Sequence, residues 1–149
     1  MADPTPKPYR GSGITVTFES SRCLHFAECL RGLPEVFDVK ARPWIRPDNA
    51  DPAAVADVVE RCPSGALRYA LRDGAVETPP EPTLVTVLEH GPILLHGDLA
   101  LTGPGETLQR ETRVAICACG RSARRPLCDN TCRNDRAMAA LLARRGVSE

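Results

Sequence analysis

The sequence predicts an α+β protein made of two small modules. Short stretches in which apolar and polar residues alternate indicate several half-buried strands, and one stretch with a helical apolar face indicates a helix between them. Residues 79–82 have the sequence Pro-Pro-Glu-Pro, which is typical of a stiff, extended linker. This linker divides the chain into residues 12–78 and residues 83–149, and residues 1–11 are expected to form a flexible tail.

The first module begins with residues 14–18, whose alternation of apolar residues with threonine predicts a strand. A helix is predicted from Pro52 to Arg61, because Asp51 is a good N-cap and proline fits the first helical turn. Residues 67–71 alternate again, and the pair Asp73-Gly74 predicts a hairpin turn after this second strand.

Three strands and one helix are predicted in the second module. Residues 84–88 and 93–96 form two of the strands, separated by Gly91-Pro92, and residues 113–117 form a third that runs into a group of cysteines. A C-terminal helix with an apolar face is predicted to end at Gly146.

Composition limits the classes of function. The chain has 149 residues, with 19 basic and 19 acidic side chains, a polar N-terminus and no apolar run near the roughly 20 residues of a membrane span. A soluble, cytoplasmic protein is therefore expected. Its seven cysteines are odd in number and clustered, which favours metal or redox chemistry over disulfides. Metal binding would also stabilise modules whose cores alone supply only about 3–5 kcal/mol.

The first cysteine group consists of Cys23, Cys29 and Cys62, the last of which is followed by proline. Bacterial ferredoxins use C-x2-C-x2-C and a distant Cys-Pro, and Phe26 stands here at the middle position. With the segments C-L-H-F-A-E-C, L-P-E-V-F-D, R-P-W-I and R-C-P-S-G-A-L, residues 14–69 resemble the divergent single-cluster ferredoxins, which are related to ferredoxins that serve bacterial monooxygenases. The resemblance implies a βαββαβ fold around a cuboidal iron–sulfur cluster held by the three cysteines.

Three thiolates leave one corner of such a cluster without a cysteine. An empty corner gives 3Fe–4S, which is the preferred expectation, and a non-cysteine ligand gives 4Fe–4S. His25 is the candidate for that ligand, ahead of Glu28, and a loop histidine without a metal is the alternative. Buried thiols with no metal remain a further alternative for the three cysteines. Phe37 and Trp44 are expected to be core residues that shield the cluster.

The second cysteine group lies in residues 117–132, with the sequence C-A-C-G-R-S-A-R-R-P-L-C-D-N-T-C. This segment resembles the CDGSH iron–sulfur domain of the NEET proteins, and the resemblance extends over residues 84–135. It implies a 2Fe–2S cluster with Cys117, Cys119, Cys128 and Cys132 as ligands. It also implies that five residues support the cluster loop: Ser122, Pro126, Asp129, Asn130 and Thr131.

Two positions depart from the CDGSH pattern. Asn130 replaces glycine, and asparagine is the non-glycine residue that best tolerates a left-handed backbone. Cys132 replaces the distinctive histidine, which adds a negative charge and removes a protonatable ligand, so a lower reduction potential is expected. A structural zinc site held by the same four cysteines is the alternative.

Eight arginines and two acidic residues lie between residues 113 and 145. These charges could balance the cluster, form a patch for an acidic redox partner, or contact nucleic acid, which the shortage of aromatic residues disfavours. His90 and His96 are expected to be surface or packing residues.

The patterns together predict a two-cluster iron–sulfur protein that carries single electrons between redox partners. No catalytic constellation is recognised in the sequence, so an enzyme is not expected. A cluster carrier or redox sensor is one alternative, and a zinc-stabilised interaction module is another. The resemblance to the CDGSH family also makes a homodimer one expectation, whereas membrane and nucleic-acid partners are not expected.

Overall fold

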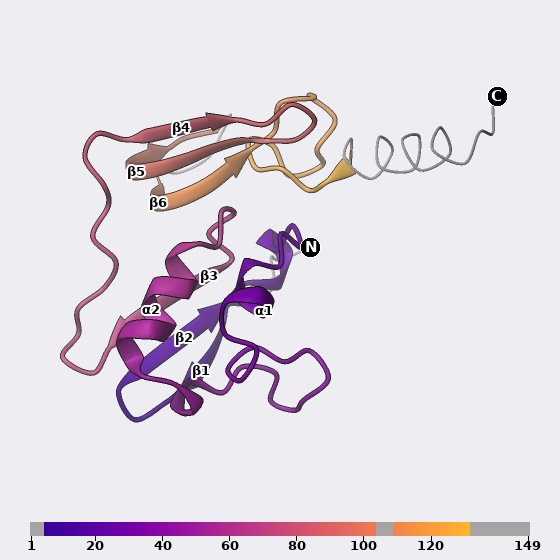
Figure 1. The fold of residues 1–149 in the computed structure, drawn as a ribbon. Coiled ribbons are helices and arrows are strands. Elements are labelled where there is room, and N and C mark those ends of the chain that lie inside the picture. The colour runs from indigo at the N-terminus through magenta and orange to yellow at the C-terminus, as the bar shows by residue number, and fades with distance from the viewer. Residues whose placement is uncertain (1–4, 104–108, 132–149) are drawn as a thin grey trace.

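The computed structural model describes residues 5–103 and 109–131, and the predicted C-terminal helix lies outside these ranges. The described residues form two three-stranded antiparallel sheets with few helices, one sheet in each module (Figure 1). The first module contains β1 (Lys7–Arg10), β2 (Ile14–Phe18), η1 (Ser20–Arg22), α1 (Glu28–Gly32), η2 (Pro47–Asn49), α2 (Pro52–Glu60) and β3 (Leu67–Leu71). The second contains β4 (Leu84–Val87), β5 (Ile93–Leu101) and β6 (Gln109–Ile116).

Strand β1 corrects the expectation that residues 1–11 are a flexible tail. Residues 7–10 pair antiparallel with β2, with Tyr9 opposite Val16. Proline is tolerated at position 8 because β1 is an edge strand of the order β1-β2-β3. Tyr9 is buried and its ring meets that of Trp44 edge-on, so this aromatic contact anchors the segment to the module.

The predicted βαββαβ order is not reproduced by regular strands. Between β2 and β3 lie α1, a single antiparallel bridge from Phe37 to Ile45, and α2. The two middle strands of the predicted order are therefore reduced to this one bridge, and β1 is a strand that the predicted order does not contain. Other local predictions are confirmed: Asp51 caps α2 by accepting a hydrogen bond from the backbone of Ala53 at 3.1 Å.

The core of the first module lies between α2 and the sheet. Val55 and Val59 of α2 are fully buried and belong to one apolar cluster with Ile14 and Val16 of β2. Phe37 is buried in the same cluster, as predicted. Trp44 packs against it, and its ring lies 4.9 Å from that of Phe18.

The second sheet has the order β4-β5-β6 and lies beside the first module (Figure 1). All three predicted strands are present, although β5 and β6 are longer than predicted and their register shifts between His96 and Leu99. Strand β4 is exposed along its whole length, whereas Val114 and Ala115 of β6 are buried. Among the described residues, no helix is long and apolar enough to cross a membrane.

Candidate metal centres

Cys23, Cys29 and Cys62 come from three separate segments and line one pocket. Cys23 follows η1, Cys29 lies in the first turn of α1, and Cys62 follows the end of α2. The pocket is mainly apolar, with Phe18, Leu24, Phe26, Trp44, Ala66 and Leu67 among its walls. Three thiols in one apolar pocket are the ligand type that an iron–sulfur cluster uses and could serve three of its four corners, so the residues fit this group.

The loop between Cys23 and Cys29 has an unusual backbone. His25 and Ala27 have φ angles of 59° and 63°, which is the left-handed region that costs a non-glycine residue about 1–2 kcal/mol. Arg31 donates a hydrogen bond to the carbonyl of Phe26 at 2.8 Å and so ties down the loop. Nδ1 of His25 lies 3.9 Å from Sγ of Cys23, and the imidazole also lines the pocket. The candidate fourth ligand therefore lines the same pocket as the three cysteines.

Burial disfavours free thiolates at these positions. It raises the pKa of Cys29 to about 11, with the neighbouring Cys62 adding to the effect. Burial also raises the pKa of Cys23 and of Cys128 in the second module. Without a cation these thiols keep their protons at neutral pH, so metal uptake releases protons and is favoured by higher pH.

The second cysteine group sits on a loop that continues β6 and folds back on it. Cys117 donates a backbone hydrogen bond to the carbonyl of Pro126 at 2.8 Å, and Cys128 donates one to that of Ala115 at 2.9 Å. The sulfurs of Cys117 and Cys119 are 3.7 Å apart. Two thiolates on one tetrahedral ion, each about 2.3 Å from the metal, would have nearly this separation. Cys132 lies outside the described residues.

Backbone amides point at all three described sulfurs of this loop. Gly120 donates to Cys117 at 3.2 Å, Arg121 to Cys119 at 3.3 Å, and Asn130 to Cys128 at 3.4 Å. Such N–H···S bonds favour the thiolate form and tune the potential of iron–sulfur centres. Within the described ranges, no three His, Cys, Asp or Glu side chains converge on a point suited to a single metal ion.

Polar side chains close the same loop. Oγ of Ser122 donates to the carbonyl of Leu127 at 2.7 Å. The carboxylate of Asp129 accepts from the backbone of Ala123 and from the backbone and hydroxyl of Thr131. The hydroxyl of Thr131 is the main cause that lowers the pKa of Asp129, so this carboxylate stays ionised and keeps its acceptor role.

Two buried arginines join the modules, which the sequence did not predict. Arg22 of the first module binds both carboxylate oxygens of Glu111 of β6 at 3.0 Å. Its other amino group donates to the carbonyls of Ser64 and Arg113, both at 3.1 Å. A buried ion pair adds little net stability, but its loss is costly, so an arrangement of the modules that breaks this contact is disfavoured.

Arg113 makes the reciprocal contact from the second module. Its guanidinium pairs with the carboxylate of Glu77 at 2.9 Å and donates to the carbonyls of Cys62 and Leu67. Gly65 of the Cys-Pro-Ser-Gly segment lies against the same strand, and a Cβ there would be 2.2 Å from the carbonyl oxygen of Arg113. The loop that carries Cys62 is therefore shaped by both modules.

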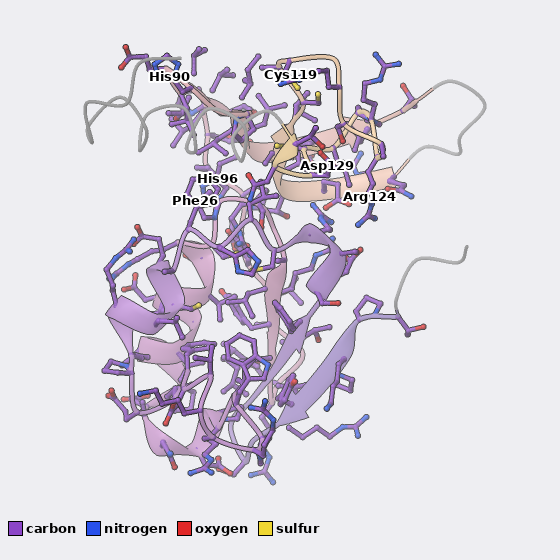
Figure 2. The ribbon with its side chains drawn as sticks, turned by 90° about the vertical axis from the view of Figure 1, so that its right-hand side faces the viewer. Phe26, His90, His96, Cys119, Arg124 and Asp129 are labelled. Carbon is purple, nitrogen blue, oxygen red and sulfur yellow. The ribbon has the colours of Figure 1, made fainter. Side chains whose placement is uncertain are left out.

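The two cysteine loops also touch each other. Leu24 is buried together with Ala115 and Cys128, and Phe26 packs against this group. Asn130 donates a side-chain hydrogen bond to the carbonyl of Leu24 at 3.0 Å. Phe26 lies at the boundary between the modules, whereas Cys119 lies toward the outer side of the second module (Figure 2).

The interface revises the expectations for single charged residues. Arg113 is buried between the modules, and Arg124 donates to the carbonyl of Ser21 at 2.8 Å, so neither is simply part of a surface patch. Nε2 of His96 lies 2.8 Å from the carboxylate of Glu77, whereas His90 is exposed. The remaining arginines after residue 132 lie outside the described ranges.

Comparison with known proteins identifies both modules. Residues 9–72 match the family described as divergent 4Fe-4S mono-cluster, and residues 90–132 match the iron-binding zinc finger of CDGSH type. Proteins named "Uncharacterized protein YjdI" from Escherichia coli strains K12 and O157:H7 are each 46% identical over 61 residues, which cover 41% of this chain and 80% of the relative. No solved structure matches significantly. The chain therefore belongs to the divergent 4Fe-4S mono-cluster family and joins this domain to a CDGSH-type iron-binding domain.

Proposed function

We propose that this iron–sulfur protein carries single electrons between redox partners, using one cluster in each module. The contact between the two cysteine loops is the observation that carries the proposal. Leu24, which follows Cys23, is buried in one small apolar cluster with Ala115 and Cys128, so segments that carry cysteines of the two groups meet at the interface. A bound iron–sulfur cluster supplies one-electron chemistry, while the chain holds the irons and limits access of water.

Cys23, Cys29 and Cys62 are proposed to hold the first cluster, and Cys117, Cys119, Cys128 and Cys132 the 2Fe–2S cluster. The family match supports a cluster of the 4Fe–4S type in the first module. A 3Fe–4S form with an empty corner stays the preferred expectation for the isolated protein. The position of His25 beside Cys23 supports the alternative in which this imidazole binds the fourth iron.

Iron and acid-labile sulfide analysis with low-temperature electron paramagnetic resonance tests this composition. An empty corner predicts a near-isotropic signal from the oxidised protein, and Phe26→Cys should then favour four irons. If the native protein instead holds four irons in this module and His25→Ala removes one, His25 is a ligand and the empty-corner expectation is wrong.

The second cluster provides a test of the ligand set. Cys132→His restores the histidine of the CDGSH pattern and should raise the midpoint potential, because a neutral imidazole replaces a thiolate. An unchanged potential would contradict the assignment of Cys132. Zinc in place of iron in the purified protein would favour the zinc-stabilised interaction module instead.

Repeated reduction and reoxidation separates electron transfer from cluster delivery. An electron carrier keeps both clusters through many cycles, whereas a cluster carrier or redox sensor loses one as its output. No class of redox partner, catalytic role or substrate is proposed for the protein.

A further inference from the structure

Asn130 occupies the point at which the second cysteine loop reaches the first. Its φ angle is 68°, a left-handed conformation that glycine adopts freely and asparagine tolerates. A glycine at this position would keep the backbone turn but would have no side chain to cross the interface. The structure thus gives the asparagine a role that the turn alone does not require.

The side chain of Asn130 has one defined partner across the interface. Nδ2 donates to the carbonyl oxygen of Leu24 at 3.0 Å. Because a carbonyl oxygen can only accept, the NH2 end of the Asn130 amide must face Leu24. Oδ1 of the same amide is buried without a hydrogen-bond partner among the described residues. The bond to Leu24 therefore determines the orientation of the amide.

This bond connects two ligand-bearing segments directly. Leu24 lies between Cys23 and His25, and the backbone of Asn130 donates to Sγ of Cys128 at 3.4 Å. Leu24 and Cys128 are both buried in the same small apolar group. A shift of either cysteine loop must break the hydrogen bond from the Asn130 side chain to Leu24 or move the other loop.

We propose that Asn130 is a positioning residue that joins the two cysteine loops, so that an occupied cluster site in one module slows loss of the cluster from the other. The proposal rests on the two cluster sites of the proposed function. Coupling of this kind is reciprocal for the binding free energies, because each site changes the affinity of the other by the same factor, whereas the rates of loss need not be symmetric. One buried hydrogen bond corresponds to about a fivefold effect.

A double-mutant cycle on the full-length, cluster-loaded protein tests the coupling. The proteins are the native chain, Cys62→Ser, Asn130→Gly and the double variant, challenged with an iron chelator. Native mass spectrometry follows loss of the two-iron cluster separately from loss of the larger one. Emptying the first site should speed loss of the two-iron cluster about fivefold in the native background and have little effect with Asn130→Gly. Equal effects in both backgrounds, or no effect in the native one, would overturn the proposal.

Amide hydrogen exchange of residues 21–26 gives a second, independent readout. Asn130→Gly and Asn130→Asp, which cannot donate to Leu24, should both raise exchange in this segment. Arg110→Gln is the matched control, because it removes an exposed ion pair to Asp98 within the second sheet. If the control raises exchange as much as the Asn130 variants, the proposal is wrong. If Cys62→Ser leaves the iron content unchanged, the ligand assignment fails instead, and the exchange data still decide the role of Asn130.

Discussion

The two modules differ in where their buried side chains lie. In the first module, eleven buried apolar residues from β1 to β3 form one continuous core. In the described part of the second module, Ala115 and Cys128 are buried together with Leu24 of the first module, and Arg113 is buried against the loop at Cys62. Strand β4 leaves Val87 74% exposed. Part of the inner surface of the described second sheet is thus buried against the first module.

This difference shows that two modules of similar length need not depend on each other equally for their cores. The first module closes its core within its own sequence, because α2 covers the sheet formed by β1, β2 and β3. The second sheet has no described helix on its face. Part of its buried surface lies against the first module instead. Cluster binding would add to both, since a metal centre that ties distant segments together contributes directly to folding.

Separating the modules is the strongest test of this comparison. The proline-rich break at residues 79–82 predicts that residues 1–80 and 81–149 each fold alone with their own cluster. We now expect residues 1–80 to give a cooperative unfolding transition, and residues 81–149 to give one only when residues 1–80 are added. Circular dichroism and iron content of each fragment measure this. Independent folding of residues 81–149 would mean that residues outside the described ranges complete its core.

Substitution of Arg113 should have the next largest effect. Arg113→Met keeps the length of the side chain but removes the guanidinium from the carboxylate of Glu77, which is 9% exposed and then keeps only the imidazole of His96 beside it. Breaking such a buried pair costs about 3–5 kcal/mol. Chemical unfolding of the full chain measures the loss, with Arg110→Gln as a control expected to stay within about 0.5 kcal/mol. A loss as small as that of the control would show that the interface does not depend on this ion pair.

Gly65→Ala tests the close approach of β6 to the Cys-Pro-Ser-Gly segment. The new Cβ would lie 2.2 Å from the carbonyl oxygen of Arg113, and the φ angle of 73° disfavours any side chain. Overpacking and backbone strain together predict a loss of about 2–4 kcal/mol. Gly74→Ala has a φ angle of 89° but no atom within 4 Å of its Cβ, so it serves as a control for strain alone. Equal losses for the two variants would argue against tight docking at Gly65.

The smallest predicted effect belongs to a contact within the first module. Hydrogen bonds from the backbone and the hydroxyl of Ser12 lower the pKa of Asp48 below its ordinary value of 3.8. The carboxylate therefore adds stability above pH 3.8, and this contribution is lost as the pH falls through the lower pKa of the folded state. Asp48→Asn should be slightly less stable than the native chain at pH 6, with the difference shrinking toward pH 3. Denaturation midpoints at several pH values measure this, and a pH-independent difference would contradict it.

The local features of the protein were determined by the sequence. Alternation predicted β2, β3 and the second sheet, and Asp51 with Pro52 predicted the start of α2, because these signals depend on residues that are neighbours in the chain. Both family resemblances were likewise confirmed, since thiol spacing is a short-range pattern. The tail assignment failed at residues 7–10, because an edge strand held by one buried tyrosine carries little local signal.

Only the tertiary structure decided how the two cysteine groups relate. Arg22 and Glu111, Arg113 and the carbonyl of Cys62, and Asn130 and the carbonyl of Leu24 are each far apart in the sequence. An arginine near a cluster motif carries the same charge whether it faces water or a carboxylate of another module, so its sequence context cannot distinguish these roles. These roles are decided when the modules pack together, because packing removes water from the charged side chains. A buried charge is costly unless the fold places an opposite charge or hydrogen-bond partners beside it.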